Sequence, residues 1–134
     1  MSIEEDILRS SRIVAIVGLS ANPDRPSYRV ANYLKENGYT IIPVNPSEKM
    51  ILDEACYPSL SSILGRVEIV DIFRKPEDVL PIVLEAIEIG ANTIWMQEGV
   101  INEEAANKAK EAGLKVVMNK CMLKEHQKFT KSYC

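Results

Sequence analysis

The hydrophobic and polar positions along this chain repeat as an amphipathic helix, a glycine and a short apolar strand. The spacing of the apolar residues predicts helices over residues 27–37, 59–64, 76–89 and 102–112. A glycine follows each of these segments, as is common at helix C-termini. The pattern is typical of a chain in which helices and strands alternate.

The expected strands are mostly continuous apolar runs, which read RIVAIVG, YTIIPV, VEIVDIF, NTIWM and LKVVM. Such runs are typical of parallel strands that are covered on both faces. We predict a single α/β domain over residues 1–134, with a Rossmann-like, doubly wound parallel sheet of five strands and helices on both faces. The expected strand order is 3-2-1-4-5 with right-handed crossovers, so a ligand crevice should lie at the carboxyl ends of strands 1 and 4.

Several residues mark where the helices should begin. Ser27 and Asn102 are suitable N-caps, and Pro76 suits the first position of a helix. Ser2 and Glu5 have the spacing of a capping box for a short leading helix. The polar sequence after Cys121 is expected to form a short helix and a loose tail.

Composition narrows the possible functions. The chain has 134 residues, of which 46% are hydrophobic and 26% charged, as in an ordinary globular protein. Its net charge of −3 argues against a nucleic-acid partner. It shows neither a long apolar segment nor a secretory signal, so we expect a cytoplasmic protein without a membrane partner. The cysteines, Cys56, Cys121 and Cys134, lack the spacing of a metal site.

The loop after the first expected strand is the first candidate for ligand binding. It runs from Gly18 to Ser27 and is longer than most loops between a strand and a helix. Gly18 allows the backbone to approach a ligand, and Ser20 supplies a hydroxyl group. Arg25 can bind a phosphate with two hydrogen bonds, and the helix that Ser27 opens attracts anions. We therefore predict a phosphate-binding loop.

This loop differs from the usual dinucleotide-binding fingerprint. Residues 18–23 read GLSANP instead of G-x-G-x-x-G, and Asn45 and Pro46 stand where an NAD site has an acidic residue. Together with Lys49, this end of the second strand favours a phosphorylated ribose. Coenzyme A carries a 3′-phosphate and NADP a 2′-phosphate, so both ligands fit this observation.

The ends of the later strands add further candidates. Arg74 follows the third strand and either contacts phosphate or lies in a solvated loop. Phe73 either packs on the adenine or completes the core, and Val79 could face either way. Gln97 and Gly99 end the fourth strand abruptly and form a second polar segment that can approach a ligand.

Catalytic candidates are few. Glu98 has no partner in the sequence that would make it a general base, and we assign no catalytic and no metal-binding residue. Cys121 is either a half-buried structural thiol or a thiol that lies close to a ligand thiol. The single histidine, His126, is expected at the surface.

These motifs together resemble the small stand-alone CoA-binding proteins of bacteria and archaea. The resemblance extends over about residues 13–121 and rests on G-x-S with R-P-S, on V-N-P, on F-R and on W-M-Q-x-G. The family is similar to the CoA-binding domain of the succinyl-CoA synthetase alpha subunit. It implies a Rossmann-like fold that binds coenzyme A.

The resemblance also implies a role for each part of the site. Next to the pyrophosphate it places Gly18, Leu19, Ser20, Arg25 and Ser27. It places Asn45, Pro46 and Lys49 near the ribose phosphate, and Phe73, Arg74 and Val79 beside the adenosine. Gln97 and Gly99 would border the pantetheine, and Asn119 and Cys121 match an Asn-Cys pair of the synthetase.

Two departures from the family limit what is implied. The phosphohistidine segment of the synthetase belongs to another domain, so ligase activity is not implied. Asp53 replaces a glycine that is common in the small proteins, which affects the loop that carries Lys49. We predict a CoA- or acyl-CoA-binding protein without evident catalytic machinery. The alternatives are an NADP- or acyl-CoA-dependent enzyme and a redox sensor that uses the thiol of Cys121.

Overall fold

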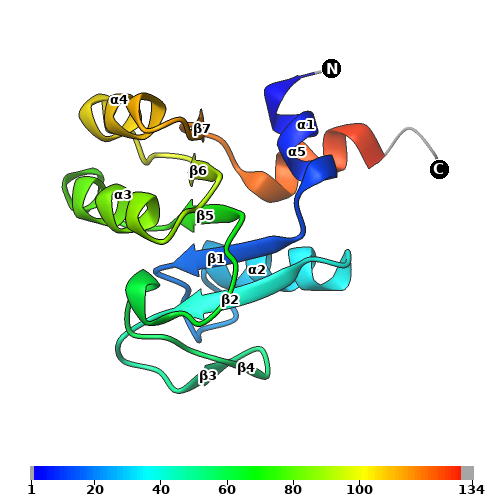
Figure 1. The fold of residues 1–134 in the computed structure, drawn as a ribbon. Helices are drawn as coiled ribbons and strands as arrows, with labels where there is room; N and C mark the ends of the chain where they lie inside the picture. Colours follow the sequence, from blue (N-terminus) through cyan, green and yellow to red (C-terminus); the bar gives the residue numbers. More distant parts are fainter. Residues whose placement is uncertain (1, 131–134) are drawn as a thin grey trace.

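A parallel β-sheet forms the centre of the molecule, and helices pack on both of its faces (Figure 1). The computed structural model describes residues 2–130, so the predicted tail and Cys134 lie outside the described residues. In spatial order the strands are β2 (Thr40–Val44), β1 (Ile13–Val17), β5 (Ile69–Ile72), β6 (Thr93–Met96) and β7 (Lys115–Val117). The predicted α/β class and doubly wound parallel sheet are confirmed.

The predicted strand order, 3-2-1-4-5, is wrong. The third strand of the sheet along the chain, β5, lies between β1 and β6, which gives the order 2-1-3-4-5. Local chain occupies the outer edge of β2, where the N–H of Asn45 donates to Tyr57 and the N–H of Tyr57 donates to Pro43. All residues of β5 are buried, as in a strand with neighbours on both sides. The direction of winding therefore reverses between β1 and β5, and not between strands 1 and 4.

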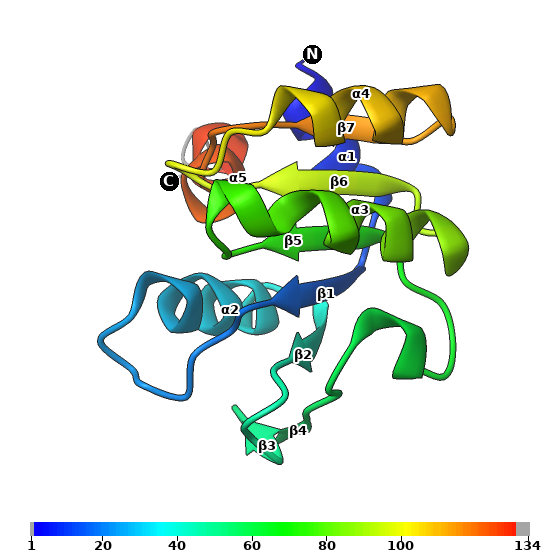
Figure 2. The ribbon, with the colours of Figure 1, turned by 90° about the vertical axis from the view of Figure 1, so that its left-hand side faces the viewer.

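The helices form two layers. One face of the sheet carries α3 (Val79–Glu88) and α4 (Glu103–Glu111), which lie in front of the strands in Figure 2. The other face carries α1 (Ile3–Ser10), α2 (Pro26–Glu36) and α5 (Met122–Thr130). Among the described residues, no helix combines the length and the hydrophobicity needed to cross a membrane.

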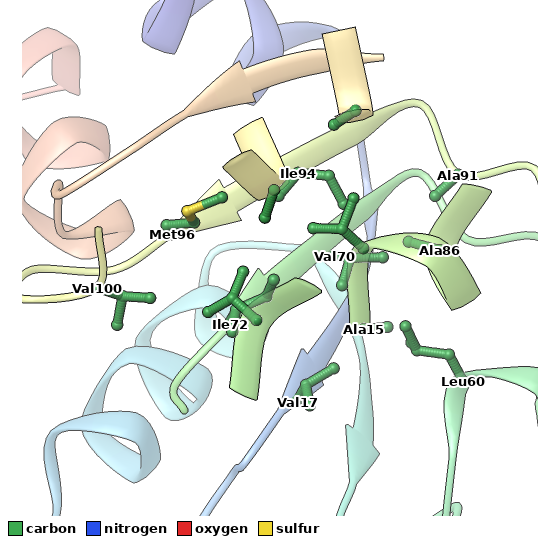
Figure 3. Close-up of a cluster of buried hydrophobic side chains, with 14 of the residues drawn as sticks. Ala15, Val17, Leu60, Val70, Ile72, Ala86, Ala91, Ile94, Met96 and Val100 are labelled. Atoms are coloured by element: carbon green, nitrogen blue, oxygen red, sulfur yellow. The ribbon is translucent and has the colours of Figure 1, made fainter. Parts of the chain in front are cut away.

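Each layer encloses its own hydrophobic core. On the side of α3 and α4, Val70 and Ile72 of β5 pack among small residues such as Ala86 (Figure 3). On the opposite side the core contains Trp95, whose side chain is fully buried, and Leu34 of α2. Burial on both faces explains why the strands are continuous apolar runs.

Two of the predicted helix starts are confirmed. The side chain of Asn102 accepts a hydrogen bond from the N–H of Ala105, and that of Ser2 accepts one from the N–H of Glu5. The prediction for Ser27 is wrong, because α2 begins at Pro26. Proline suits the first helical position, so Ser27 lies inside the helix.

The two middle helices are shorter than predicted. Residues 59–64 form only a 3-10 turn, η1 (Leu60–Ser62). The predicted helix over residues 76–89 begins as a 3-10 turn, η2 (Pro76–Asp78), and continues as α3. The connection between β2 and β5 therefore contains no α-helix.

That connection contains a two-stranded hairpin that the sequence pattern did not reveal. It pairs β3 (Met50–Ile51) with β4 (Glu54–Ala55) in antiparallel orientation. The turn residues, Leu52 and Asp53, have positive φ angles of 54° and 64°. Such a turn favours glycine, which explains physically why glycine suits the position of Asp53.

Candidate functional site

A pocket of about 650 Å³ opens at the carboxyl ends of β1, β5 and β6, where the direction of winding reverses. In Figure 2 these strand ends and the loop before α2 lie on the same side of the sheet. The predicted site residues that line the pocket are Gly18, Ser20, Arg25, Ser27, Phe73, Arg74, Gln97, Gly99 and Cys121. Segments that are far apart in the sequence thus contribute to one cavity.

The loop between β1 and α2 is held in shape by its own serines. The hydroxyl oxygen of Ser27 accepts a hydrogen bond from the N–H of Ser20 at 3.0 Å. The hydroxyl oxygen of Ser20 in turn accepts from the N–H of Asn22, also at 3.0 Å. These bonds bring the loop over the first turn of α2, whose dipole favours an anion at this end.

Positive charge gathers on one side of the pocket. Arg25 and Lys75 line it and form no ion pair with any described residue. Arg74 contacts Asp78 at 3.4 Å, and both side chains are substantially exposed, so this pair is weak. All three basic groups can therefore turn toward an anionic ligand.

Two hydrogen bonds link the ends of β6 and β7 beside the pocket. The side-chain oxygen of Asn119 accepts a hydrogen bond from the N–H of Gly99 at 2.8 Å. The indole N–H of Trp95 donates to the carbonyl oxygen of Lys120 at 2.9 Å. This second bond fixes the segment that leads into α5 and places the half-buried Cys121 at the pocket wall.

Two predicted contact residues have side chains that do not reach the pocket. Leu19 and Val79 are completely buried in the cores on opposite faces of the sheet. Only their backbone groups could meet a ligand. The side chain of Val79 faces the core.

The predicted residues at the end of β2 lie outside the pocket lining. Pro46 and Lys49 are exposed on the loop that leads to the hairpin. The amide group of Asn45 donates to the carbonyl oxygen of Leu19 at 2.9 Å and its oxygen accepts from the N–H of Ser47 at 2.8 Å. Asn45 thus joins the loops that follow β1 and β2.

Glu98 lies at the pocket but is engaged by a basic side chain. The ammonium group of Lys124 contacts its carboxylate at 3.1 Å, and both side chains are largely exposed. That Glu98 does not act as a general base stays a prediction.

The sequence analysis missed one residue beneath the site. Asp71, in the middle of β5, is completely buried, and Oδ1 of its carboxyl group accepts a hydrogen bond from the amide of Gln97 at 2.6 Å. Burial raises the pKa of Asp71 to about 8, although the bond from Gln97 acts in the opposite direction. The available signal was an acidic residue inside the otherwise apolar run VEIVDIF.

The prediction for His126 is wrong, since this residue is buried. Its ring lies among Tyr33, Tyr39 and Phe129, with edge-to-face contacts to all three rings. The hydroxyl group of Tyr33 and Nδ1 of His126 are 2.7 Å apart. This cluster joins α2 to α5 and lies outside the lining of the 650 Å³ pocket.

A doubly wound sheet with a basic, open pocket at its switch point defines a nucleotide-binding type of α/β domain. A family model described as a CoA binding domain matches residues 12–127. The chain therefore belongs to the CoA binding domain family.

Similar proteins agree with this assignment. The chain is 39% identical to the uncharacterized protein YneT of Bacillus subtilis (strain 168), over 91% of this chain and 90% of that protein. A hypothetical protein from Pyrococcus horikoshii OT3 has the same fold, with a TM-score of 0.91 and 42% identity over 95% of this chain and 92% of that one. An ADP-forming acetate–CoA ligase of Archaeoglobus fulgidus is 36% identical over 53% of this chain, which spans 11% of that ligase.

Proposed function

We propose that this chain binds coenzyme A, free or as an acyl thioester, in the pocket at the carboxyl ends of β1, β5 and β6. The observation that carries the proposal is one pocket, in a CoA binding domain, that combines basic, aromatic and amide side chains. A volume of about 650 Å³ lies within the range of small-molecule sites.

Charge and helix position indicate where the pyrophosphate would bind. Arg25 lies directly before α2 and Arg74 lies two residues after β5, so the two guanidinium groups border the pocket from different elements. The first turn of α2 adds the positive end of the helix dipole. A pyrophosphate between these groups would replace the weak contact of Arg74 with Asp78 by charge-assisted hydrogen bonds.

The remaining parts of coenzyme A have suitable neighbours. The half-buried ring of Phe73 offers an apolar surface to the adenine, and Gln97 and Gly99 offer polar groups to the amides of pantetheine. Lys49 and Asn45 lie on the loop after β2, beside the loop that lines the pocket. We assign the 3′-phosphate to this edge.

Calorimetric titration of the purified chain tests the proposal. We expect binding of CoA, weaker binding of dephospho-CoA and still weaker binding of NADP. Arg25→Gln and Arg74→Gln should each weaken CoA binding about tenfold, because each removes a hydrogen bond to a charged group. Arg29→Gln is the matched control, since Arg29 is exposed on α2 outside the pocket lining. Binding of NADP in preference to CoA would overturn the proposal.

The position of Cys121 supports a second candidate function, a sensor of thiol redox state. Its half-buried thiol belongs to the pocket that would hold the pantetheine arm. The thiolate of Cys121 would attack the sulfur–sulfur bond of CoA disulfide. One CoA would leave as a thiolate, and the other would stay bound to Cys121 in a mixed disulfide, so the exchange needs no further oxidant.

Intact-mass measurement after incubation with CoA disulfide tests this candidate. We expect an adduct with the mass of one CoA, which is lost in Cys121→Ser and retained in Cys56→Ser. An adduct that persists in Cys121→Ser, for example on Cys134, would exclude the sensor and leave CoA binding untouched.

A further inference from the structure

Asp71 occupies a position where an acidic residue is unexpected. It lies in β5 between Ile16 of β1 and Trp95 of β6, its register partners in the sheet. Its side chain faces the apolar core beneath α2 and α5, as does that of Ile69 two residues earlier. Its Oδ2 atom is buried and has no hydrogen-bond partner among residues 2–130.

Burying this carboxyl group lowers the stability of the fold. A buried polar atom without a partner is unfavourable, and a carboxyl group in an apolar layer is more so. Burial also raises the pKa of Asp71 to about 8, which shows how poorly the site accommodates the charge. Residues that lower stability in this way are expected at functional positions.

The hydrogen bond of Asp71 connects it to the pocket. Gln97 is almost completely buried, yet it forms part of the pocket lining directly above Asp71. Its Nε2 group donates to Oδ1 of Asp71 at 2.6 Å, and no described donor reaches its Oε1 atom. The amide therefore uses its donor side below the pocket and has its acceptor side left for a ligand.

We propose that Asp71 is a positioning residue that holds the Gln97 amide with its oxygen toward the pocket, as an acceptor for an N–H group of the ligand. This proposal rests on the proposed binding of CoA and deepens it. The pantetheine arm of CoA contains two amide N–H groups. The N–H groups of the adenosine half belong to the amino group of adenine, which we assign to the side of Phe73. Asp71 therefore acts on the recognition of pantetheine and not on that of the nucleotide.

Two variants separate this role from a purely structural one. Asp71→Leu removes the acceptor for Gln97 and keeps the branching at Cγ, so the amide can turn in either direction. Asp71→Asn retains an acceptor oxygen but can also donate, as the protonated carboxyl group of Asp71 can below its pKa of about 8. The comparison is therefore made at pH 9, where Asp71 is ionised and only accepts, so that Asn only partly fixes the amide. We expect the apparent affinity to fall in proportion to the fraction of molecules with the correct orientation.

The experiment compares CoA with adenosine 3′,5′-bisphosphate, which lacks pantetheine. In Asp71→Leu, CoA affinity should fall about tenfold, while the affinity for the bisphosphate should change less than twofold. In Asp71→Asn, the loss for CoA should be about two- to threefold. Both variants should unfold at a temperature equal to or higher than that of the original chain.

Other results would contradict the positioning role. An equal loss for both ligands would indicate a general disturbance of the pocket, and unchanged CoA affinity in Asp71→Leu would exclude any contribution. The side-chain amide signals of Gln97 in NMR spectra provide a readout without ligand, since they should shift and broaden in Asp71→Leu. If the original chain binds no CoA, the proposed function fails, and these signals still decide whether Asp71 fixes the amide.

Discussion

A Cβ atom on Gly18 would lie 2.3 Å from the carbonyl oxygen of Phe73. The ends of β1 and β5 thus approach each other so closely at the switch point that only a residue without a side chain fits between them. The φ angle of Gly18, 87°, is also one that other residues rarely adopt. The floor of the pocket therefore depends on this glycine.

Gly18→Ala should lower the free energy of unfolding by about 2–4 kcal/mol, since backbone strain and a steric clash add together. Gly90→Ala is the matched control. Gly90 also has a positive φ angle, but no atom of the described part of the chain lies within 4 Å of a Cβ atom there. Urea denaturation of both variants separates the two effects. Equal losses in the two variants would mean that the chain relieves the contact with Phe73 by a small shift.

At the hairpin turn, a substitution to glycine should raise the free energy of unfolding. Asp53 adopts a φ angle of 64° in a two-residue turn, where glycine is favoured. Asp53→Gly should raise the free energy of unfolding by about 0.5–1 kcal/mol, and Asp53→Ala should lower it. Thermal unfolding of both variants tests this pair. A lower unfolding temperature in Asp53→Gly would show that the Asp53 side chain contributes a contact that outweighs the strain.

Local signals in the sequence predicted most of the fold. The strand order was predicted wrongly because it depends on contacts between distant segments. The caps at Ser2 and Asn102 and the glycines after the helices depend only on neighbouring residues. The strand order depends on where β5 inserts, and the outer edge of β2 is already paired with the chain around Tyr57. The hydrophobic periodicity of a single segment does not indicate where its strand lies in the sheet.

The same distinction explains the site. Any parallel order brings the strand ends to one edge of the sheet, so Ser20 and Gln97 line one pocket although the predicted order was wrong. Whether a residue near the end of a strand faces the pocket or the core depends on packing, and packing turns the side chains of Leu19 and Val79 into the cores. The role of Asp71 could not be predicted, because it depends on a hydrogen bond with Gln97, which follows another strand.

Asp71 should make stability depend on pH. Its pKa is about 8 in the folded chain and near 3.8 when unperturbed, so between these values the folded state holds a proton that the unfolded state has lost. The free energy of unfolding should therefore decrease as pH rises from about 4 to about 8. In Asp71→Asn this contribution is absent, so the stability difference between the variant and the original chain should grow with pH.

Urea denaturation at several pH values from 5 to 9 measures that difference. Comparing the two proteins at each pH removes the contributions of other groups, such as Glu68 and His126, whose lowered pKa values act in the opposite direction. A difference that stays constant across this range would show that Asp71 is ionised in the folded chain at neutral pH.

The buried histidine offers a test of the contact between α2 and α5. Burial lowers the pKa of His126, and the positive charges of Arg12 and Arg9 lower it further. A group of this kind stabilises the fold above its unfolded pKa, near 6.5, and loses that contribution as pH falls.

Because His126 is the only histidine in the sequence, its ring signals can be followed by NMR without ambiguity. We expect the ring to titrate with a midpoint below 6.5. Tyr33→Phe removes the hydrogen bond to Nδ1 and should lower the free energy of unfolding by about 1 kcal/mol. A midpoint at or above 6.5 would mean that the ring is open to water and that α5 is not held by this cluster.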